Sequence, residues 1–261
     1  MTRRAIISVS DKRGVADLAK TLVQCGFEIL STGGTAKLLK SEGVAVKEIS
    51  EVTGYPELLG GRVKTLHPAV YGGILADRSK PEHIMQLREY GMPEVEVVVV
   101  NLYPFQETVK RGGSLDEAIE NVDVGGPALI RAAAKNFKDV AVVVDPGDYG
   151  RVISELKGSG RVSAKTREEL AVKAFERTSD YDYHIANYLG KVLAEPPRLP
   201  STLRLRREKL LDLRYGENPH QSAALYADED VWPDSVLNAR KLQGKALSYN
   251  NVIDLDSALG L

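Results

Sequence analysis

Along the first half of the chain, runs of apolar residues alternate with stretches of helical periodicity. Residues 5–9 form a short apolar run of the kind found in buried strands, and residues 27–30 form a second. Between them, apolar residues recur at helical spacing over 15–23, and Gly26 is placed to end that helix. This strand and helix order predicts a parallel sheet with helices packed on its faces.

The clearest strand covers residues 95–100, which are almost all valine. β-Branched residues on both faces are typical of a strand in the middle of a parallel sheet. Pro104 cannot continue its ladder, and residues 139–144 predict a further buried strand. Further helices are expected after residues 31–35, after Ser114, from Gly125 and over 165–193.

The composition changes near residue 195. Three prolines fall within residues 195–200, a pattern that predicts a linker. We therefore expect a first domain over 1–194, a Pro-rich linker over 195–201 and a shorter segment over 202–261. Roughly 60 residues are few for an independent core, so this last segment is expected to be the start of a larger domain.

Charge and composition exclude several classes of function. The chain has 35 Lys and Arg against 36 Asp and Glu, so it lacks the basic excess of proteins that bind nucleic acid. No apolar run approaches the ~18–20 residues needed to span a membrane, and no signal peptide is recognisable. The single cysteine, Cys25, indicates a cytoplasmic protein and is expected to be buried and inert. The four histidines are widely spaced, so no metal site is predicted.

Polar clusters follow three of the predicted strands or lie in adjoining loops. In parallel α/β sheets, ligands bind beyond the carboxyl ends of the strands, so these clusters are expected to gather at one edge. They are Ser10-Asp11-Lys12, Ser31 to Thr35, Asn101-Leu102-Tyr103 and residues 121–126.

The cluster Ser31 to Thr35 is suited to hold a phosphate. Its two glycines allow close approach of the backbone, and the following helix directs free N–H groups at an anion. A tight turn with a helix cap needs the same residues, so this cluster alone leaves both interpretations open. Lys12 and Arg62 are candidates for the charge that a phosphate site requires.

Residues 60–68 predict a loop that carries two further cations. Arg62 and Lys64 are two residues apart, so an extended backbone would direct both to one side; a basic surface loop is the alternative. His67 precedes a proline and is expected to be a structural hydrogen-bonding residue. Asp123 and Lys135 flank a predicted helix, where each also fits the charge preference of a helix end.

Taken together and in order, these motifs resemble the inosine monophosphate (IMP) cyclohydrolase domain of a bifunctional family in purine biosynthesis. The resemblance runs from Met1 to about Ala194, and residues 213–221 and 247–251 resemble the opening of that family's formyltransferase domain. It implies a doubly wound, mainly parallel α/β fold similar to methylglyoxal synthase, followed by an incomplete second domain. The motifs that carry it are Ser10-Asp11-Lys12, residues 31–35, 60–68, 101–105 and 131–136.

The resemblance also implies a reaction and its residues. A formamidoimidazole carboxamide ribonucleotide would close to IMP with loss of water, and no cofactor would be required. Lys64 and Lys135 would stabilise the formyl oxygen, Asp123 would orient or accept the amide proton, and Tyr103 would relay a proton. The residues implied for the 5′-phosphate are Ser10, Lys12, Thr32, Gly33, Gly34, Thr35, Arg62 and Thr65, and those for the base are Asn101, Gly125 and Gly126.

Partners and rival functions remain open at this point. The chain lacks the Lys-His dipeptide associated with formyl transfer in that family, so this second activity is expected to be absent. The resemblance implies a homodimer. For the segment 202–261 three alternatives are open: partial disorder, pairing with another copy, or pairing with a separate chain that completes its domain. A nucleotide-binding regulatory module and a methylglyoxal synthase are the alternative functions of the same fold.

Overall fold

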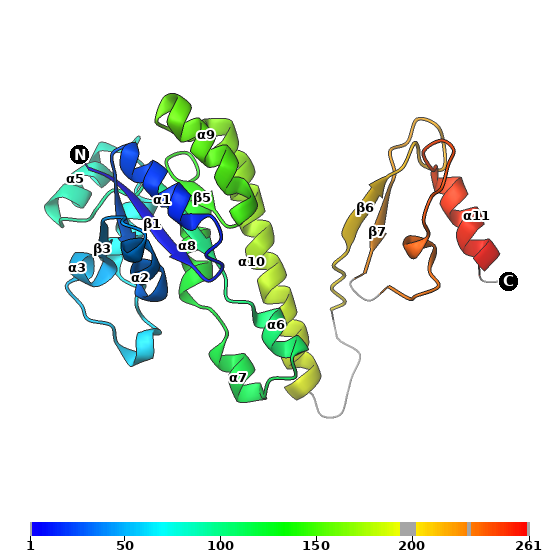
Figure 1. Cartoon of the computed structure of the whole chain (residues 1–261), viewed down its shortest axis with the longest axis horizontal. Coiled ribbons are helices and arrows are strands. Elements are labelled where there is room, and N and C mark those ends of the chain that lie inside the picture. The colour runs from blue at the N-terminus through cyan, green and yellow to red at the C-terminus, as the bar shows by residue number, and fades with distance from the viewer. Residues whose placement is uncertain (1, 194–201, 229–230, 260–261) are drawn as a thin grey trace. The chain divides into compact units, whose positions relative to one another are not determined.

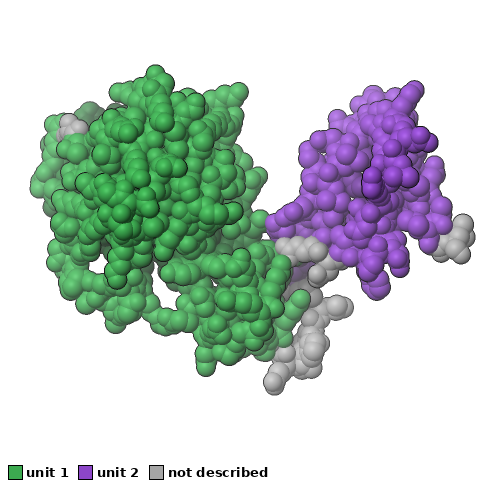
Figure 2. All heavy atoms as spheres, viewed as in Figure 1, with its two compact units in different colours: residues 1–197 green, residues 198–261 purple. Residues whose placement is uncertain are grey.

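The computed structural model describes residues 2–193, 202–228 and 231–259. The chain divides into two compact units, Met1–Pro197 and Arg198–Leu261 (Figure 2). The predicted linker over 195–201 lies outside the described residues, so the position of the domain boundary stays a prediction.

The first unit is built on a five-stranded parallel sheet with the order β3-β2-β1-β4-β5 (Figure 1). The valine run is confirmed as an interior strand, because every residue of β4 is buried and the strand pairs on both sides. The third and fifth strands are short, and β5 covers only part of the run predicted over 139–144. The strands are β1 (Arg3–Val9), β2 (Phe27–Ser31), β3 (Val46–Glu48), β4 (Val97–Asn101) and β5 (Ala141–Val143).

Helices cover both faces of this sheet, which confirms the doubly wound α/β fold. Successive strand residues face opposite cores: Ile6 packs with residues of α4, α8 and α10, whereas Ile7 packs with residues of α1, α2 and α9. The helices are α1 (Val15–Gln24), α2 (Gly33–Ser41), α3 (Ile49–Thr53), α4 (Pro68–Leu75), α5 (Pro81–Glu89), α6 (Phe105–Lys110), α7 (Leu115–Glu120), α8 (Gly125–Lys135), α9 (Tyr149–Ser159) and α10 (Ala164–Leu193), with the short 3-10 segments Leu59–Gly61 and Pro146–Asp148.

The helical periodicity located α1, α2, α8 and α10 correctly. Gly26 has a φ of 82° just after α1, as expected of a residue that ends a helix. Val23, at the end of the apolar stripe predicted over 15–23, is exposed, and so is Phe175 in the helix predicted over 165–193. Helices α4, α5 and α9 were not predicted; α4 contains two adjacent glycines, which hide its helical pattern.

The second unit holds an antiparallel pair of strands, β6 (Glu208–Asp212) and β7 (Ala224–Ala227), the 3-10 segment Val236–Asn238 and a helix, α11 (Tyr249–Leu259). Within the described part of this unit, Ala227 is the one hydrophobic residue that is buried, and Trp232 is 83% exposed. This agrees with the expectation that the segment is too short for a core of its own. The helix α11 was not predicted.

Two glycines provide a test of packing around α4. A Cβ at Gly73 would lie 1.8 Å from the carbonyl oxygen of Pro93, whereas a Cβ at Gly158 in α9 would have nothing within 4 Å. We expect Gly73→Ala to lower the free energy of unfolding by about 1–3 kcal/mol, because the backbone must move. Gly158→Ala should raise it by about 0.5 kcal/mol. Urea denaturation measures both, and equal effects would contradict this packing.

Candidate functional site

The loop after β1 is tied to the end of β4 by the side chain of Asn101. Its Oδ1 accepts hydrogen bonds from Ser10 N at 2.6 Å, Ser10 Oγ at 2.9 Å and Asp11 N at 2.9 Å, and its Nδ2 donates to Asp11 O at 2.9 Å. Asn101 is buried and its whole amide is engaged. In this structure Asn101 therefore fixes the polar loop after β1, and its predicted place beside the base stays a prediction.

Two lysine ammonium groups lie at the amino end of α2. A Cβ at Gly33 would lie 3.3 Å from Lys64 Nζ, and a Cβ at Gly34 would lie 3.3 Å from Lys12 Nζ. The N-cap residue Thr32 makes no side-chain capping bond, so the first N–H groups of α2 are open to a ligand. The structure thus brings Lys12, Lys64 and the two glycines together as a cradle suited to an anion.

Thr35, another residue predicted at the phosphate, is buried within this cradle. Its hydroxyl accepts a hydrogen bond from Val9 N at 3.1 Å and donates one to Val9 O at 3.0 Å. These contacts attach the first turn of α2 to the end of β1. In this structure Thr35 holds the cradle in place through the backbone of β1.

The loop that carries Arg62 and Lys64 is not extended. Leu59, Gly60 and Gly61 have φ values of 52°, 64° and 91°, and Arg62 follows in the right-handed helical region. The expectation that an extended backbone directs Arg62 and Lys64 to one side is therefore wrong.

The two cations of this loop pair with different carboxylates. Arg62 pairs with Glu120 at the end of α7, and Lys64 Nζ lies 2.7 Å from Glu57 Oε1. A Cβ at Gly61 would lie 2.2 Å from Lys64 Cε and would displace this pair, and the φ of 91° at Gly61 also favours glycine. Sequence reasoning missed both partners: Glu120 is far along the chain from Arg62, and no local pattern marks Glu57 as the partner of Lys64.

Asp123 caps the amino end of α8 from a half-buried position. Its Oδ1 accepts a hydrogen bond from Gly126 N at 2.8 Å, and its own N–H donates to Tyr181 Oη at 2.8 Å. Burial raises the pKa of the Asp123 carboxyl, although the N–H groups of Gly126 and Tyr103 partly offset this rise. A carboxyl group of this kind is suited to take up or release a proton near a bound ligand.

Thr65 links the loop of Lys64 to the start of α8. Its side chain is buried, and a Cβ at Gly125 would lie only 3.1 Å from Thr65 Oγ1. A Cβ at Gly126 would lie 2.4 Å from Asp123 Oδ2. Glycine at both positions therefore allows Thr65 and Asp123 to approach the first turn of α8.

The remaining two residues implied for catalysis occupy different places. Tyr103 follows β4 and is 58% exposed, and its backbone N–H donates a hydrogen bond to the carboxylate of Asp123.

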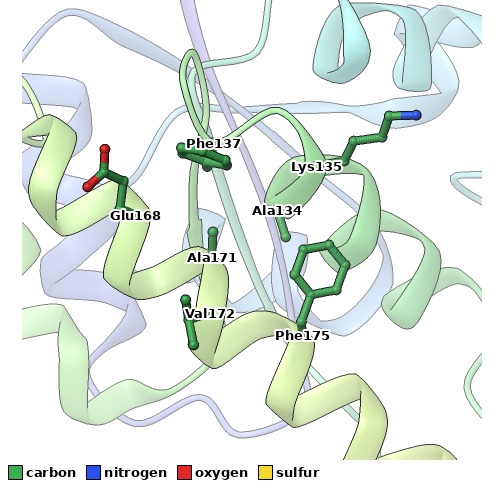
Figure 3. Close-up of a pocket in the computed structure, with 7 residues that line it drawn as sticks. All are labelled: Ala134, Lys135, Phe137, Glu168, Ala171, Val172 and Phe175. Carbon is green, nitrogen blue, oxygen red and sulfur yellow. The ribbon is translucent and has the colours of Figure 1, made fainter.

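Lys135 is at the opposite end of α8, about 15 Å from Gly125 at 1.5 Å per residue. It lines a hollow of ≈ 350 Å³ between α8 and α10, with its ammonium directed away from Phe137 and Phe175 (Figure 3). The structure does not bring Lys135 to the cluster around Asp123.

His67 has the structural role predicted for it. Its Nδ1 accepts a hydrogen bond from Ala69 N at 3.1 Å and so caps α4.

Cys25 is only half-buried, not fully buried as expected, and its thiol donates to Leu156 O. Among the described residues, no three His, Cys, Asp or Glu side chains are grouped so that they could hold a metal ion. None of the helices in that part of the chain has the length and apolar character to cross a membrane.

Comparison with known proteins matches both parts of the chain. Residues 14–128 match the model of the MGS-like domain, and residues 133–261 match that of the AICARFT/IMPCHase bienzyme. The bifunctional purine biosynthesis protein PurH of Persephonella marina is 50% identical over 262 residues, covering 100% of this chain and 51% of that protein. PurH of Acetivibrio thermocellus is 52% identical over 260 residues, covering 99% and 50%. The chain thus spans about half the length of these curated relatives.

A solved structure also matches the chain. The crystal structure of ForH is 40% identical in sequence and superposes with a TM-score of 0.61. The match covers 71% of this chain and 97% of ForH.

The raised pKa of Asp123 predicts a pH-dependent stability difference. A folded-state pKa above the ordinary 3.8 stabilises the fold below that value, and this contribution is lost as pH rises through the raised pKa. Asp123→Asn does not titrate, so its free energy of unfolding relative to the wild type should increase over that pH range. Urea denaturation from pH 3 to pH 8 tests this, with the exposed Asp116→Asn as control. A pH-independent difference for Asp123→Asn would contradict the burial of the carboxylate.

Proposed function

The chain belongs to the AICARFT/IMPCHase bienzyme family, and on this premise we propose that its first unit is an IMP cyclohydrolase. The substrate is 5-formamidoimidazole-4-carboxamide ribonucleotide, which closes to IMP with loss of water. One observation carries the proposal: two lysine ammonium groups and a half-buried carboxyl of raised pKa lie at the same edge of the sheet. An anionic nucleotide that must exchange protons during ring closure needs both features.

The 5′-phosphate is assigned to the cradle at the amino end of α2. Lys12 supplies charge over Gly34, and the open N–H groups of the first turn supply hydrogen bonds. Ser10 and Thr32 border this cradle, and Arg62 contributes once it leaves Glu120. The base is assigned to the neighbourhood of Gly125 and Gly126, the residues that the resemblance implies, where Thr65 and Asp123 pack against the first turn of α8.

The chemistry is an intramolecular condensation. The carboxamide nitrogen attacks the formyl carbon, a C–N bond forms, and the formyl oxygen gains protons and leaves as water. One of the lost hydrogens comes from the carboxamide nitrogen and the other from the formamide nitrogen. Since both reacting groups belong to one molecule, a site that folds the formyl group toward the amide supplies much of the acceleration.

Charge and proton transfer account for the rest of the acceleration. Lys64 stabilises negative charge on the formyl oxygen, and Asp123 accepts the amide proton in its carboxylate form. Tyr103, exposed beside Asp123, relays a proton to the leaving oxygen. We leave Lys135 out of this arrangement, because it lies a helix length from Asp123 in the same chain.

The alternatives make different demands on the site. A methylglyoxal synthase needs a histidine beside its triose phosphate, but Nδ1 of His67 is engaged in capping α4. A regulatory module needs the cradle alone, without Asp123 and Tyr103. The proposal does not extend to formyl transfer. A cytoplasmic location and a homodimer, or a separate chain completing the second domain, remain expectations.

Two lysine substitutions separate the proposed roles. With the formylated ribonucleotide as substrate, ultraviolet absorbance follows conversion to IMP. Lys64→Ala should lower kcat by about 10²-fold or more, because its charge acts in the transition state. Lys12→Ala should instead raise KM by about tenfold with little change in kcat, as expected for a ground-state contact. The exposed Lys157→Ala in α9 serves as the control.

Each other outcome has a definite meaning. An unchanged kcat in folded Lys64→Ala would remove Lys64 from the mechanism, and a selective loss of kcat in Lys12→Ala would contradict its place at the phosphate. A wild-type protein that binds IMP but does not turn over the substrate would support the regulatory alternative.

A further inference from the structure

The side chain of Tyr71 poses a problem that the proposed reaction does not solve. Its ring packs against the core beside α8, and its hydroxyl oxygen is buried. In the part of the chain that the structure describes, this is the one buried side-chain polar atom without a hydrogen-bond partner. Burying a hydroxyl without a partner destabilises a fold, so such a group calls for an explanation.

The surroundings of this hydroxyl belong to the candidate site. The Thr65 hydroxyl lies close to the Tyr71 hydroxyl and lowers its pKa, but the two groups do not meet in hydrogen-bond geometry; the charge of Asp123 raises the pKa of Tyr71. Thr65 Oγ1 in turn lies against the backbone of Gly125. The Tyr71 hydroxyl and the first turn of α8 therefore both lie close to Thr65.

The protonation state of this hydroxyl is fixed by burial. Desolvation raises the pKa of Tyr71 to about 12, so the group keeps its proton throughout the range in which the protein works. A neutral phenol is a hydrogen-bond donor as well as an acceptor. Thr65 carries a single proton and two lone pairs, so it can accept one hydrogen bond and donate another.

We propose that Tyr71 is a positioning residue that acts through Thr65. When a nucleotide binds, the Tyr71 hydroxyl donates to Thr65 Oγ1, and the one proton of Thr65 is thereby directed outward to an oxygen atom of the ligand. We call this pair of hydrogen bonds, from Tyr71 to Thr65 and from Thr65 to the ligand, the relay. In the free protein the Tyr71 hydroxyl has no partner, and ligand binding completes the relay. The identity of the ligand as IMP rests on the proposed function.

The test compares stability with affinity in Tyr71→Phe, which keeps the ring and removes only the hydroxyl. Because the hydroxyl has no partner in the free protein, the urea midpoint of Tyr71→Phe should not fall. The dissociation constant for IMP, measured by calorimetry, should rise about fivefold, the value of one hydrogen bond. A hydroxyl with a purely structural role would give the opposite pair of results.

A double-mutant cycle shows whether Thr65 transmits the effect. In the Thr65→Val background, which lacks the hydroxyl, Tyr71→Phe should leave the IMP dissociation constant unchanged. In the Thr65→Ser background, which keeps it, Tyr71→Phe should again raise that constant about fivefold. Equal effects in the two backgrounds would overturn the relay.

Two other tyrosines provide matched controls. Tyr181 Oη accepts from Asp123 N and donates to Asn121 O, so Tyr181→Phe should lower the urea midpoint. Tyr90 is exposed, and Tyr90→Phe should change neither quantity. If the wild type does not bind IMP, the proposed function fails and the relay fails with it. If the wild type binds IMP and Tyr71→Phe binds it equally well, only the relay fails.

Discussion

The parallel pairing of β1 with β4 is the constraint on which the site depends. The chain builds outward from β1 to β2 and β3 on one side and from β4 to β5 on the other, so the direction of winding reverses between β1 and β4. Loops that follow two such strands leave in opposite directions and open a crevice at the carboxyl edge. Asn101 joins the ends of these two strands by binding the loop after β1 through both ends of its amide.

Segments far apart in the chain converge on this edge because glycines allow close approach. Gly33 and Gly34 make room for two ammonium groups, and Gly125 makes room for Thr65. The pair of Lys64 with Glu57 is partly exposed, with 31% and 53% of the two side chains accessible. Exposed ion pairs of this kind stabilise a fold by only about 0–1 kcal/mol, so an anionic ligand can replace Glu57 at small cost.

The sequence was informative wherever structure follows from local periodicity. Residues 95–100 are apolar on both faces, and this alone placed β4 inside the sheet. Apolar spacing located α1 and α10, and the Gly-Gly-Pro sequence at residues 125–127 marked the start of α8. The pattern failed at α4, whose adjacent glycines resemble a loop, and at Arg62, whose direction depends on three left-handed residues before it. Lys135 shows a further limit, because similarity assigns it a role while the direction of α8 carries it away from Asp123. Pairings such as Arg62 with Glu120 arise only from the folded chain.

Three departures from the ordinary rules of folding occur close to this edge. In the described part of the chain, Leu59 is the one residue other than glycine with a positive φ, and Tyr71 holds the unpartnered buried hydroxyl. Asp123 keeps a carboxyl group where burial raises its pKa. Each costs stability, and strained or unsatisfied groups persist where function requires them. Leu59 lies in the loop that leads to Lys64, and Tyr71 lies close to both Thr65 and Asp123, so the three indicate a functional site on physical grounds that do not depend on family resemblance.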